Sequence, residues 1–391
     1  MGSRRNVVIG LLVFAVALVV VVGAVVLAGG DDGAGPVGAV AAVQDDHLPT
    51  APIADLPARL DLIADTGVTT TRVDLFWSDL APSRPDSPRD PSDAAYDFSR
   101  ADLIVQGLSE RGITPIVSVY SAPAWATGGR TDDRPPVNRI SPDPDDFGDF
   151  MAALATRYAG DFTSPGGQTL PEVRRYEIWN EPNLSGFLIP QSQEADPESV
   201  DPAMRLDIYA AMVTSAYPAI KRANPDAIVI AGVGGPRSST SATGISAIDW
   251  ARGLAERDIR LDAYSQHVYP AAAPLTATTV VPSWSSIGRF LDELDAFAPG
   301  LPLYITEAGY TTAVTDYRDT AVTEEQQAEY LTQIYSLPQL RSQRIRTVVW
   351  FNLQDNASWP AGLLREDLER KPSHGRFVDV VKGQGGATLT D

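Results

Sequence analysis

Two glutamates stand where short apolar runs give way to turn residues. Glu181 lies in the run YEIWNEPN and Glu307 in the run LYITEAGY, and each run has the composition of a buried strand that ends close to its glutamate. Cleavage of a glycosidic bond needs two carboxyl groups, one to protonate the leaving oxygen and one to stay ionised at the anomeric carbon. The pair therefore predicts sugar-cleaving chemistry, provided that the fold brings both strand ends to one place.

The rest of the chain repeats a unit that can do this. A short apolar run rich in β-forming residues is followed by a turn and by a longer segment whose apolar residues recur three and four positions apart. Eight such units predict a single (β/α)8 barrel, in which the carboxyl ends of all strands meet at one mouth. An open doubly wound sheet is the alternative, but no glycine-rich phosphate fingerprint follows the first run. The expected strands cover residues 37–44, 69–76, 113–120, 173–179, 227–233, 261–268, 303–306 and 347–351.

Helices are expected between these strands. The clearest start signal is the pair Thr323 and Gln326, which has the spacing of a capping box, so that hydroxyl and amide satisfy free backbone N–H groups. Trp250 and Trp284 fall on expected helices and read as core residues. Further helices are expected over residues 53–65, around 103–108, around 150–158, and over 201–223 and 377–382.

The first thirty residues form a separate segment. After two arginines, residues 7–28 contain only apolar residues and glycine. As a helix this run would be about 33 Å long, enough to cross a bilayer, whereas a cleaved secretory signal has a shorter apolar core. We therefore expect residues 1–30 to be an uncleaved transmembrane anchor that leaves the rest extracytoplasmic, with secretion after signal cleavage as the alternative. Residues 31–36 would be a linker, and residues 37–391 the catalytic domain.

Charge and composition restrict the partners. The formal net charge is −19, and no cluster of Lys and Arg is present, so a nucleic-acid partner is not expected. The chain has no cysteine, which excludes disulfides. Its three histidines show no ligand-like spacing, so we expect no metal and no other cofactor, and a metal-dependent hydrolase is the weakest interpretation.

Several motifs resemble those of the retaining (β/α)8 glycoside hydrolases of clan A, the 4/7 superfamily. The segments WNEPN and YITE are similar to the signature ends of strands four and seven of that clan, and TRVDLFWSDLAPS, QHVYP and WFNLQDNASWPAGLL are similar to its strands two, six and eight. The likeness is greatest to the branches that contain β-xylosidases, cellulase-like enzymes and exopolysaccharide glycosidases. It implies that Glu181 is the acid/base, that Glu307 is the nucleophile, and that Asn180 hydrogen-bonds the sugar 2-OH.

Other residues near the strand ends suit supporting roles. Arg72 would keep Glu307 ionised, although it could instead pair with Asp74. Tyr269 could orient the nucleophile, and His267 is either a pocket residue or a core imidazole. Three indoles offer flat faces for the C–H side of a pyranose, or else simply pack: Trp350, Trp125 and Trp77.

The expected function is that of a retaining hydrolase acting on an extracellular or cell-surface polysaccharide. Retention requires the two carboxyl groups to lie roughly 5–5.5 Å apart, whereas a gap of about 6.5–9.5 Å would indicate inversion. The alternative from another class is a catalytically silent glycan-binding barrel, a surface sensor or adhesin. The presence of both glutamates favours the enzyme.

Overall fold

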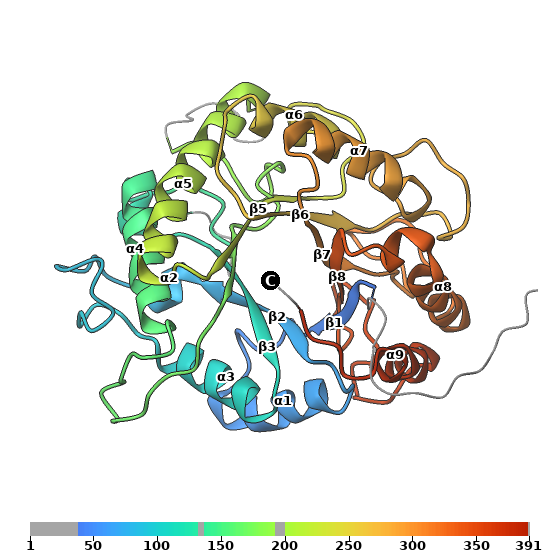
Figure 1. The fold of residues 1–391 in the computed structure, drawn as a ribbon, viewed down its shortest axis with the longest axis horizontal. Helices are drawn as coiled ribbons and strands as arrows, with labels where there is room; N and C mark the ends of the chain where they lie inside the picture. The colour runs from blue at the N-terminus through green and yellow to red at the C-terminus, as the bar shows by residue number, and fades with distance from the viewer. Residues whose placement is uncertain (1–37, 132–136, 192–199, 390–391) are drawn as a thin grey trace, which may run out of the picture. The chain divides into compact units, whose positions relative to one another are not determined.

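The computed structural model describes residues 38–131, 137–191 and 200–389. Within these residues eight parallel strands close into a barrel, each paired with the next and β1 paired with β8 (Figure 1). This confirms the predicted (β/α)8 architecture and excludes the open sheet, because an open sheet would leave β1 and β8 unpaired. The strands are β1 Val40–Gln44, β2 Thr70–Phe76, β3 Thr114–Tyr120, β4 Arg175–Ile178, β5 Ile228–Gly234, β6 Ala263–Val268, β7 Leu303–Ala308 and β8 Ile345–Trp350.

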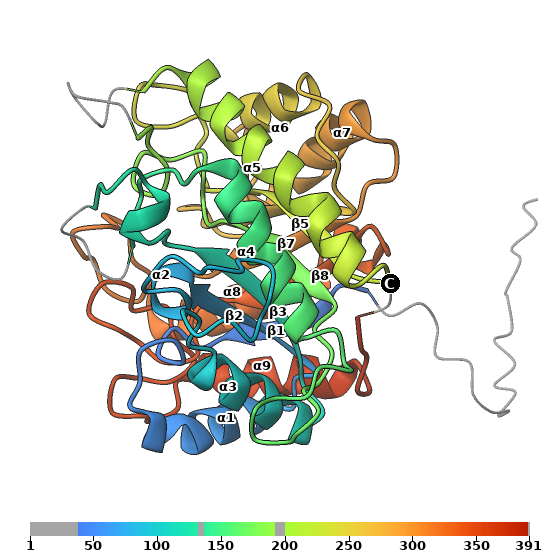
Figure 2. The same ribbon diagram turned by 90° about the vertical axis from the view of Figure 1, so that its left-hand side faces the viewer.

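Helices surround the sheet on its outer side, as the second view also shows (Figure 2). Helices α4 and α5 lie side by side in both views. The short helix α2 was not predicted; it forms directly after β2, where a loop was expected. The helices of the described residues are α1 Leu56–Ala64, α2 Trp77–Leu80, α3 Ser99–Glu110, α4 Pro144–Arg157, α5 Pro202–Ala223, α6 Ala247–Ala255, α7 Ile287–Phe297, α8 Glu324–Ser336 and α9 Pro372–Gly383.

The ends of two helices show how local sequence sets their bounds. Helix α8 begins at the predicted capping box: Thr323 Oγ1 accepts from the Gln326 N–H at 3.2 Å, and Gln326 Oε1 accepts from the Thr323 N–H at 2.9 Å. Helix α9 begins at Pro372, five residues before the expected start at Phe377. A proline suits the first helical position, because its fixed φ is already helical and no N–H is needed there.

The barrel interior has an apolar layer with a polar layer next to it. The inward apolar cluster consists of Ala42, Ile116, Ile230, Ala263, Tyr304 and Val349. Side chains alternate between the two faces of a strand, so residues two positions further on share the inward face. At four of those six positions the residues are polar and buried: Gln44, Ser118, Ser265 and Thr306. The polar layer therefore lies toward the carboxyl ends of the strands, where the sequence placed the reactive groups.

No helix among the described residues is both long and apolar enough to cross a membrane. The expected anchor over residues 7–28 lies outside the described residues and stays a prediction. The same holds for the proposed linker at 31–36. The barrel itself lies within the compact unit Pro36–Asp391.

Candidate active site

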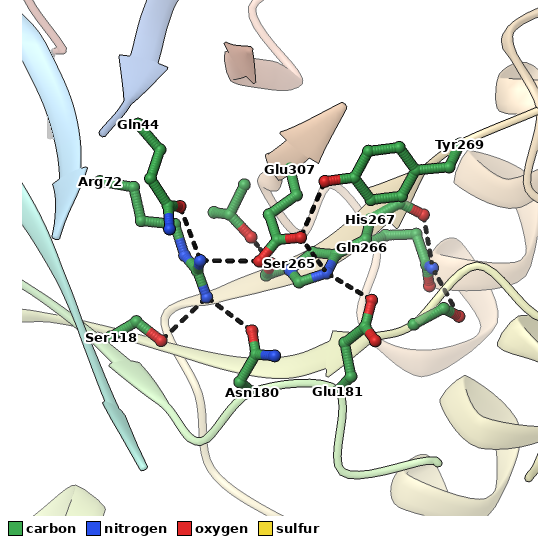
Figure 3. A network of polar contacts seen from close by, with 12 residues as sticks. Gln44, Arg72, Ser118, Asn180, Glu181, Ser265, Gln266, His267, Tyr269 and Glu307 are labelled. Atoms are coloured by element: carbon green, nitrogen blue, oxygen red, sulfur yellow. Dashed lines mark hydrogen bonds and ion pairs between the residues drawn. The ribbon is translucent and has the colours of Figure 1, made fainter. Parts of the chain in front are cut away.

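Arg72 is the central residue of the polar layer (Figure 3). It extends inward from β2 with no solvent exposure, and all five N–H groups of its guanidinium donate hydrogen bonds. Its position explains how residues far apart in the sequence are held together. Nε donates to Glu177 Oε2 at 2.6 Å, Nη1 to Glu307 Oε1 and to Gln44 Oε1 at 2.8 Å each, and Nη2 to Asn180 Oδ1 at 2.8 Å and to Ser118 Oγ at 2.9 Å.

Glu307 lies near the end of β7 with both carboxyl oxygens engaged. Oε1 accepts from Arg72, and Oε2 accepts from the Tyr269 hydroxyl at 2.8 Å. The structure thus brings together Arg72, Tyr269 and Glu307 as the sequence predicted. Arg72 also lies 3.1 Å from Asp74 Oδ1, so the alternative pairing occurs as well, through the same Nη1 atom.

Glu181 follows β4 in a turn with unusual backbone geometry. Its φ is 40°, and that of Trp179 is 67°, in the left-handed region that side chains with a Cβ rarely adopt. Asn183 holds this turn against the end of β5, because its Oδ1 accepts from the Gly235 N–H at 2.7 Å and its Nδ2 donates to Ile245 O at 2.8 Å. A Cβ on Gly235 would lie 3.0 Å from the Glu181 carboxyl carbon. The turn and the glycine together place the carboxyl group at the mouth.

His267 joins the two glutamates. Its Nδ1 lies 2.8 Å from Glu181 Oε1 and 3.3 Å from Glu307 Oε2, and its side chain is fully buried. One oxygen of each carboxyl group and the imidazole nitrogen all lie within 4.8 Å of one another. Each glutamate is only 9% exposed. The two strand ends therefore meet in one buried constellation, with little competing water.

The family follows from the sequence comparison. The sequence model of the family described as Cellulase (glycosyl hydrolase family 5) matches residues 49–356, which contain most of the barrel and the whole constellation around Arg72 except Gln44. The chain belongs to this family. It is a glycoside hydrolase, an enzyme that hydrolyses glycosidic bonds, and its membership of the clan that the motifs resembled is confirmed.

Solved structures show how widely the fold of this glycoside hydrolase is shared. A family 39 glycoside hydrolase from Bacteroides cellulosilyticus WH2 is 22% identical, with a TM-score of 0.56 over 87% of this chain, which spans 63% of that protein. A family 39 β-xylosidase from Caulobacter crescentus is 20% identical, with a TM-score of 0.60 over 89% of this chain and 72% of that one. A glucosidase from Croceicoccus marinus is 15% identical, with a TM-score of 0.65 over 90% of this chain and 69% of that one. At these identities the likeness shows the fold alone. The comparison with curated proteins finds no match.

The charges of the glycoside hydrolase site are strongly interdependent. Burial raises the pKa of Glu307, while the charges of His267 and Arg72 oppose that rise. Burial alone would lower the pKa of His267, but Glu307 and Glu181 outweigh it and raise the pKa. Burial and the nearby Glu307 hold the pKa of Tyr269 well above its usual range, so its hydroxyl stays protonated and donates. The arrangement can hold a proton between two carboxyl groups.

Two buried polar residues of the site were missed by the sequence interpretation. Gln44 bridges Arg72 to Asp74, donating from Nε2 to Asp74 Oδ2 at 3.0 Å. Burial alone would raise the pKa of Glu177, but the charge of Arg72 outweighs burial and the pKa is lowered. This carboxylate therefore stays ionised beneath the guanidinium. Gln44 ends the otherwise apolar strand β1, and Glu177 stands between Tyr176 and Ile178 in β4; a polar residue next to buried apolar ones was the available signal.

The sugar platform assigned to Trp350 is corrected by the structure. This indole is fully buried among the helices, and its Nε1 donates to Ala361 O at 3.0 Å. Val349 belongs to the inward cluster, so the alternation along β8 turns Trp350 outward and Phe351 inward. Phe351 and Trp359 are both half-buried. The ring centre of Phe351 lies 6.4 Å from that of Tyr269, and the ring centre of Trp359 lies 4.9 Å from it. The aromatic wall of the mouth is therefore formed by Phe351 and Trp359.

Of the other two indoles, Trp77 is corrected to a packing residue and Trp125 is not. Trp77 has no exposure and stacks on Phe150 with the ring centres 5.1 Å apart. Trp125 is half-buried, its edge meets Trp77 at 5.4 Å, and the guanidinium of Arg84 covers its ring at 4.7 Å. Trp77 is therefore a packing residue, whereas the sugar-platform role of Trp125 stays a prediction.

Among the residues that the structure describes, Glu181, His267 and Glu307 form a set that could coordinate a cation. The histidine spacing in the sequence gave no sign of this set. However, both oxygens of Glu307 already accept from Arg72 and Tyr269, and a divalent ion would lie beside a permanently charged guanidinium. The set suits a shared proton better than a metal ion.

Asp46, just beyond the end of β1, carries a further titratable carboxyl group near Glu307. Burial, with the charges of Asp74 and Glu307, raises the pKa of Asp46 to about 7. Between about pH 4 and pH 7 the folded protein therefore keeps a proton that the unfolded chain loses, so stability falls as pH rises through this window.

We expect Asp46→Asn to remove this loss. At about pH 4 the free energy of unfolding of the variant should equal that of the unchanged protein. At about pH 8 it should be higher by up to about 4 kcal/mol, because the amide does not ionise. Denaturant unfolding at both pH values measures the difference. An equal difference at both would contradict the raised pKa.

Proposed function

We propose that this family 5 enzyme is a retaining O-glycosyl hydrolase that cleaves an extracellular or cell-surface polysaccharide by double displacement. Glu307 is the nucleophile and Glu181 the acid/base. The observation that carries the proposal is the approach of their carboxyl oxygens to within 4.8 Å of each other. Retaining enzymes hold their two carboxyl groups roughly 5–5.5 Å apart, and inverting enzymes need about 6.5–9.5 Å to admit a water molecule.

The hydrogen-bond donors support this division of roles. Glu307 accepts one bond from a guanidinium and one from a phenol, and both bonds favour the ionised form that must attack carbon. Within the described residues, Glu181 is hydrogen-bonded to His267 through Oε1 only. Its Oε2 is therefore available to carry the proton that passes to the leaving group. The pair therefore suits one charged and one protonated carboxyl group.

The reaction then runs in two steps. A Glu307 oxygen bonds to the anomeric carbon while the glycosidic C–O bond breaks, and the Glu181 proton passes to the departing oxygen. Water next attacks the glycosyl ester, Glu181 takes the water proton, and the bond to Glu307 breaks. Asn180 uses Oδ1 to accept from Arg72, so its NH2 group is left to donate to the sugar 2-OH.

Phe351 and Trp350 allow a direct comparison of binding with packing. We expect Phe351→Ala to raise KM by roughly tenfold with little change in stability, because a half-buried ring at the mouth contacts sugar. Trp350→Ala should instead lower the free energy of unfolding by about 3–5 kcal/mol, as a buried indole does. Steady-state kinetics and denaturant unfolding of both variants measure this. The reverse pattern would restore Trp350 as the platform.

We propose an extracytoplasmic location, with residues 7–28 as the tether. The apolar length of that run supports it. Carbonate extraction of membranes from cells expressing the full chain tests the anchor, and the N-terminal sequence of the mature protein tests signal cleavage. Recovery of the barrel in the medium with a new N-terminus would replace the anchor by a cleaved signal.

A screen of aryl glycosides and purified polysaccharides, with the Glu307→Gln protein as the blank, tests the activity. We expect release of the aryl group from at least one glycoside by the unchanged protein alone. Sugar binding without any turnover would instead support the silent glycan-binding barrel.

A further inference from the structure

We propose that Asp46 recognises the glycone, hydrogen-bonding its hydroxyl groups beside Glu307, and that it restricts this position to uncharged sugars. This inference rests on the proposed function and names a substrate class for it. It assigns a specificity-determining role to a residue outside the catalytic pair. Three features of the structure carry it: the direction of the side chain, its fixed orientation, and the charges around it.

The direction follows from β1. Ala42 belongs to the inward apolar cluster, and Gln44, two residues later, bonds inward to Arg72 and Asp74. Asp46 follows two residues later, in the turn that leaves the carboxyl end of β1. Its carboxyl interacts electrostatically with Asp74 and Glu307, which places it on the inner side of the rim.

The orientation of Asp46 is fixed by two asparagines that follow β8. The Asp46 N–H donates to Asn352 Oδ1, and Asn356 Nδ2 donates to Asp46 Oδ2, each at 3.1 Å. Within the described residues, Oδ1 has no hydrogen-bond partner. A carboxyl group held by one oxygen, with the other free at the mouth, is preorganised to accept from a ligand hydroxyl.

The position of Asp46 relative to the catalytic pair selects the glycone. Only β8 separates β1 from β7, which carries Glu307, whereas Glu181 follows β4 on another part of the ring. During the proposed reaction the leaving oxygen lies at Glu181, and the sugar that becomes bonded to the enzyme lies at Glu307. A group beside Glu307 therefore faces the glycone.

The surrounding charges exclude an acidic sugar. Above about pH 7, where Asp46 is ionised, a uronate bound at this position would bring a carboxylate close to Asp46, Glu307 and Asp74. The nearby guanidinium of Arg72 cannot receive it, because its five N–H groups already donate to five side-chain oxygens. Hydroxyl groups meet no such repulsion, so the subsite suits neutral sugars.

Aryl glycosides of the sugar that the screen identifies, its deoxy analogues and the matching uronide test the proposal. For the unchanged protein, kcat/KM should fall about 10- to 100-fold when the hydroxyl that Asp46 binds is removed, and the uronide should be a poor substrate. In Asp46→Ala, the parent and that deoxy analogue should react equally. At about pH 8, where Asp46 is ionised, the uronide should gain at least about tenfold relative to the neutral sugar in Asp46→Asn.

Asp45→Asn is the matched control. Asp45 is the neighbouring carboxylate, but it pairs with Arg59, whose Nε lies 2.7 Å from it. This variant should lose stability and keep both substrate ratios. If Asp46→Ala retains the hydroxyl dependence, if Asp46→Asn leaves the uronide ratio unchanged, or if Asp45→Asn shifts both ratios equally, the assignment is overturned.

Binding separates this claim from the proposed function. Calorimetric titration of the neutral sugar into the Glu307→Gln protein, with and without Asp46→Ala, measures recognition without turnover. A loss of affinity on removing Asp46 supports the assignment even if the unchanged protein hydrolyses nothing. Equal affinity, or no binding in either protein, overturns it.

Discussion

Glu307→Gln should hydrolyse an aryl glycoside roughly 10⁴-fold more slowly than the unchanged protein, or slower still, while it continues to bind sugar. The amide is nearly the same size, and its oxygen can still accept from Arg72 while its NH2 group donates to the Tyr269 oxygen, but it cannot form the glycosyl ester. Steady-state release of the aryl group gives the rate, and calorimetry gives the binding.

Glu181 and a surface glutamate provide the comparison for that result. Glu181→Ala should retain the first step with dinitrophenyl glycosides, whose leaving group needs no proton, and should lose it with poor leaving groups. Glu329→Gln, on the exposed side of α8, should behave as the unchanged protein does. If Glu307→Gln kept more than about a tenth of the activity, Glu307 would not be the nucleophile.

Arg72→Lys should be the most damaging substitution of a residue that does not react with sugar. A lysine has three N–H donors on a point charge and cannot reproduce the five bonds of the planar fork, so Glu177 would lose its 2.6 Å partner inside the barrel. Leaving a buried charge uncompensated costs about 3–5 kcal/mol, and kcat should fall by at least about 100-fold as Glu307 and Asn180 lose their support. Denaturant unfolding and kinetics measure the two effects.

Arg89 is the matched control for the Arg72 prediction. Its Nε lies 2.6 Å from Asp149 Oδ1, but its side chain is 65% exposed. An exposed ion pair contributes about 0–1 kcal/mol, so Arg89→Lys should change the free energy of unfolding by no more than that. Equal losses of stability in the two variants would contradict the central role of Arg72.

The fold and the meeting of Glu181 with Glu307 could be predicted because they depend on features that the sequence displays directly. Strand runs alternate with helical periodicity, and the turn chemistry after each glutamate marks the end of a strand. The pairing of Arg72 with Glu307 was predicted because a barrel brings its strand ends together. The structure places Arg72 at the third position of β2, nearer the start of that strand than its end. The structure confirms that pairing at 2.8 Å.

The side of each strand that faces inward could not be predicted as well. Parallel strands are apolar on both faces, so the residue types of β8 do not show whether Trp350 or Phe351 points into the barrel. Because the alternation turns Trp350 outward, Phe351 takes the place at the mouth that the sequence had assigned to Trp350. Gln44, Glu177 and Asp46 were missed because their roles depend on neighbours from distant strands, which residue type alone does not reveal.

The configuration of the first sugar released tests the central claim most directly. Proton NMR of the reaction with the best substrate, recorded before mutarotation, distinguishes the two anomers. Two successive displacements at one anomeric carbon predict a first product with the same configuration as the substrate. An inverted first product would contradict the roles given to Glu307 and Glu181, whatever their separation in the structure.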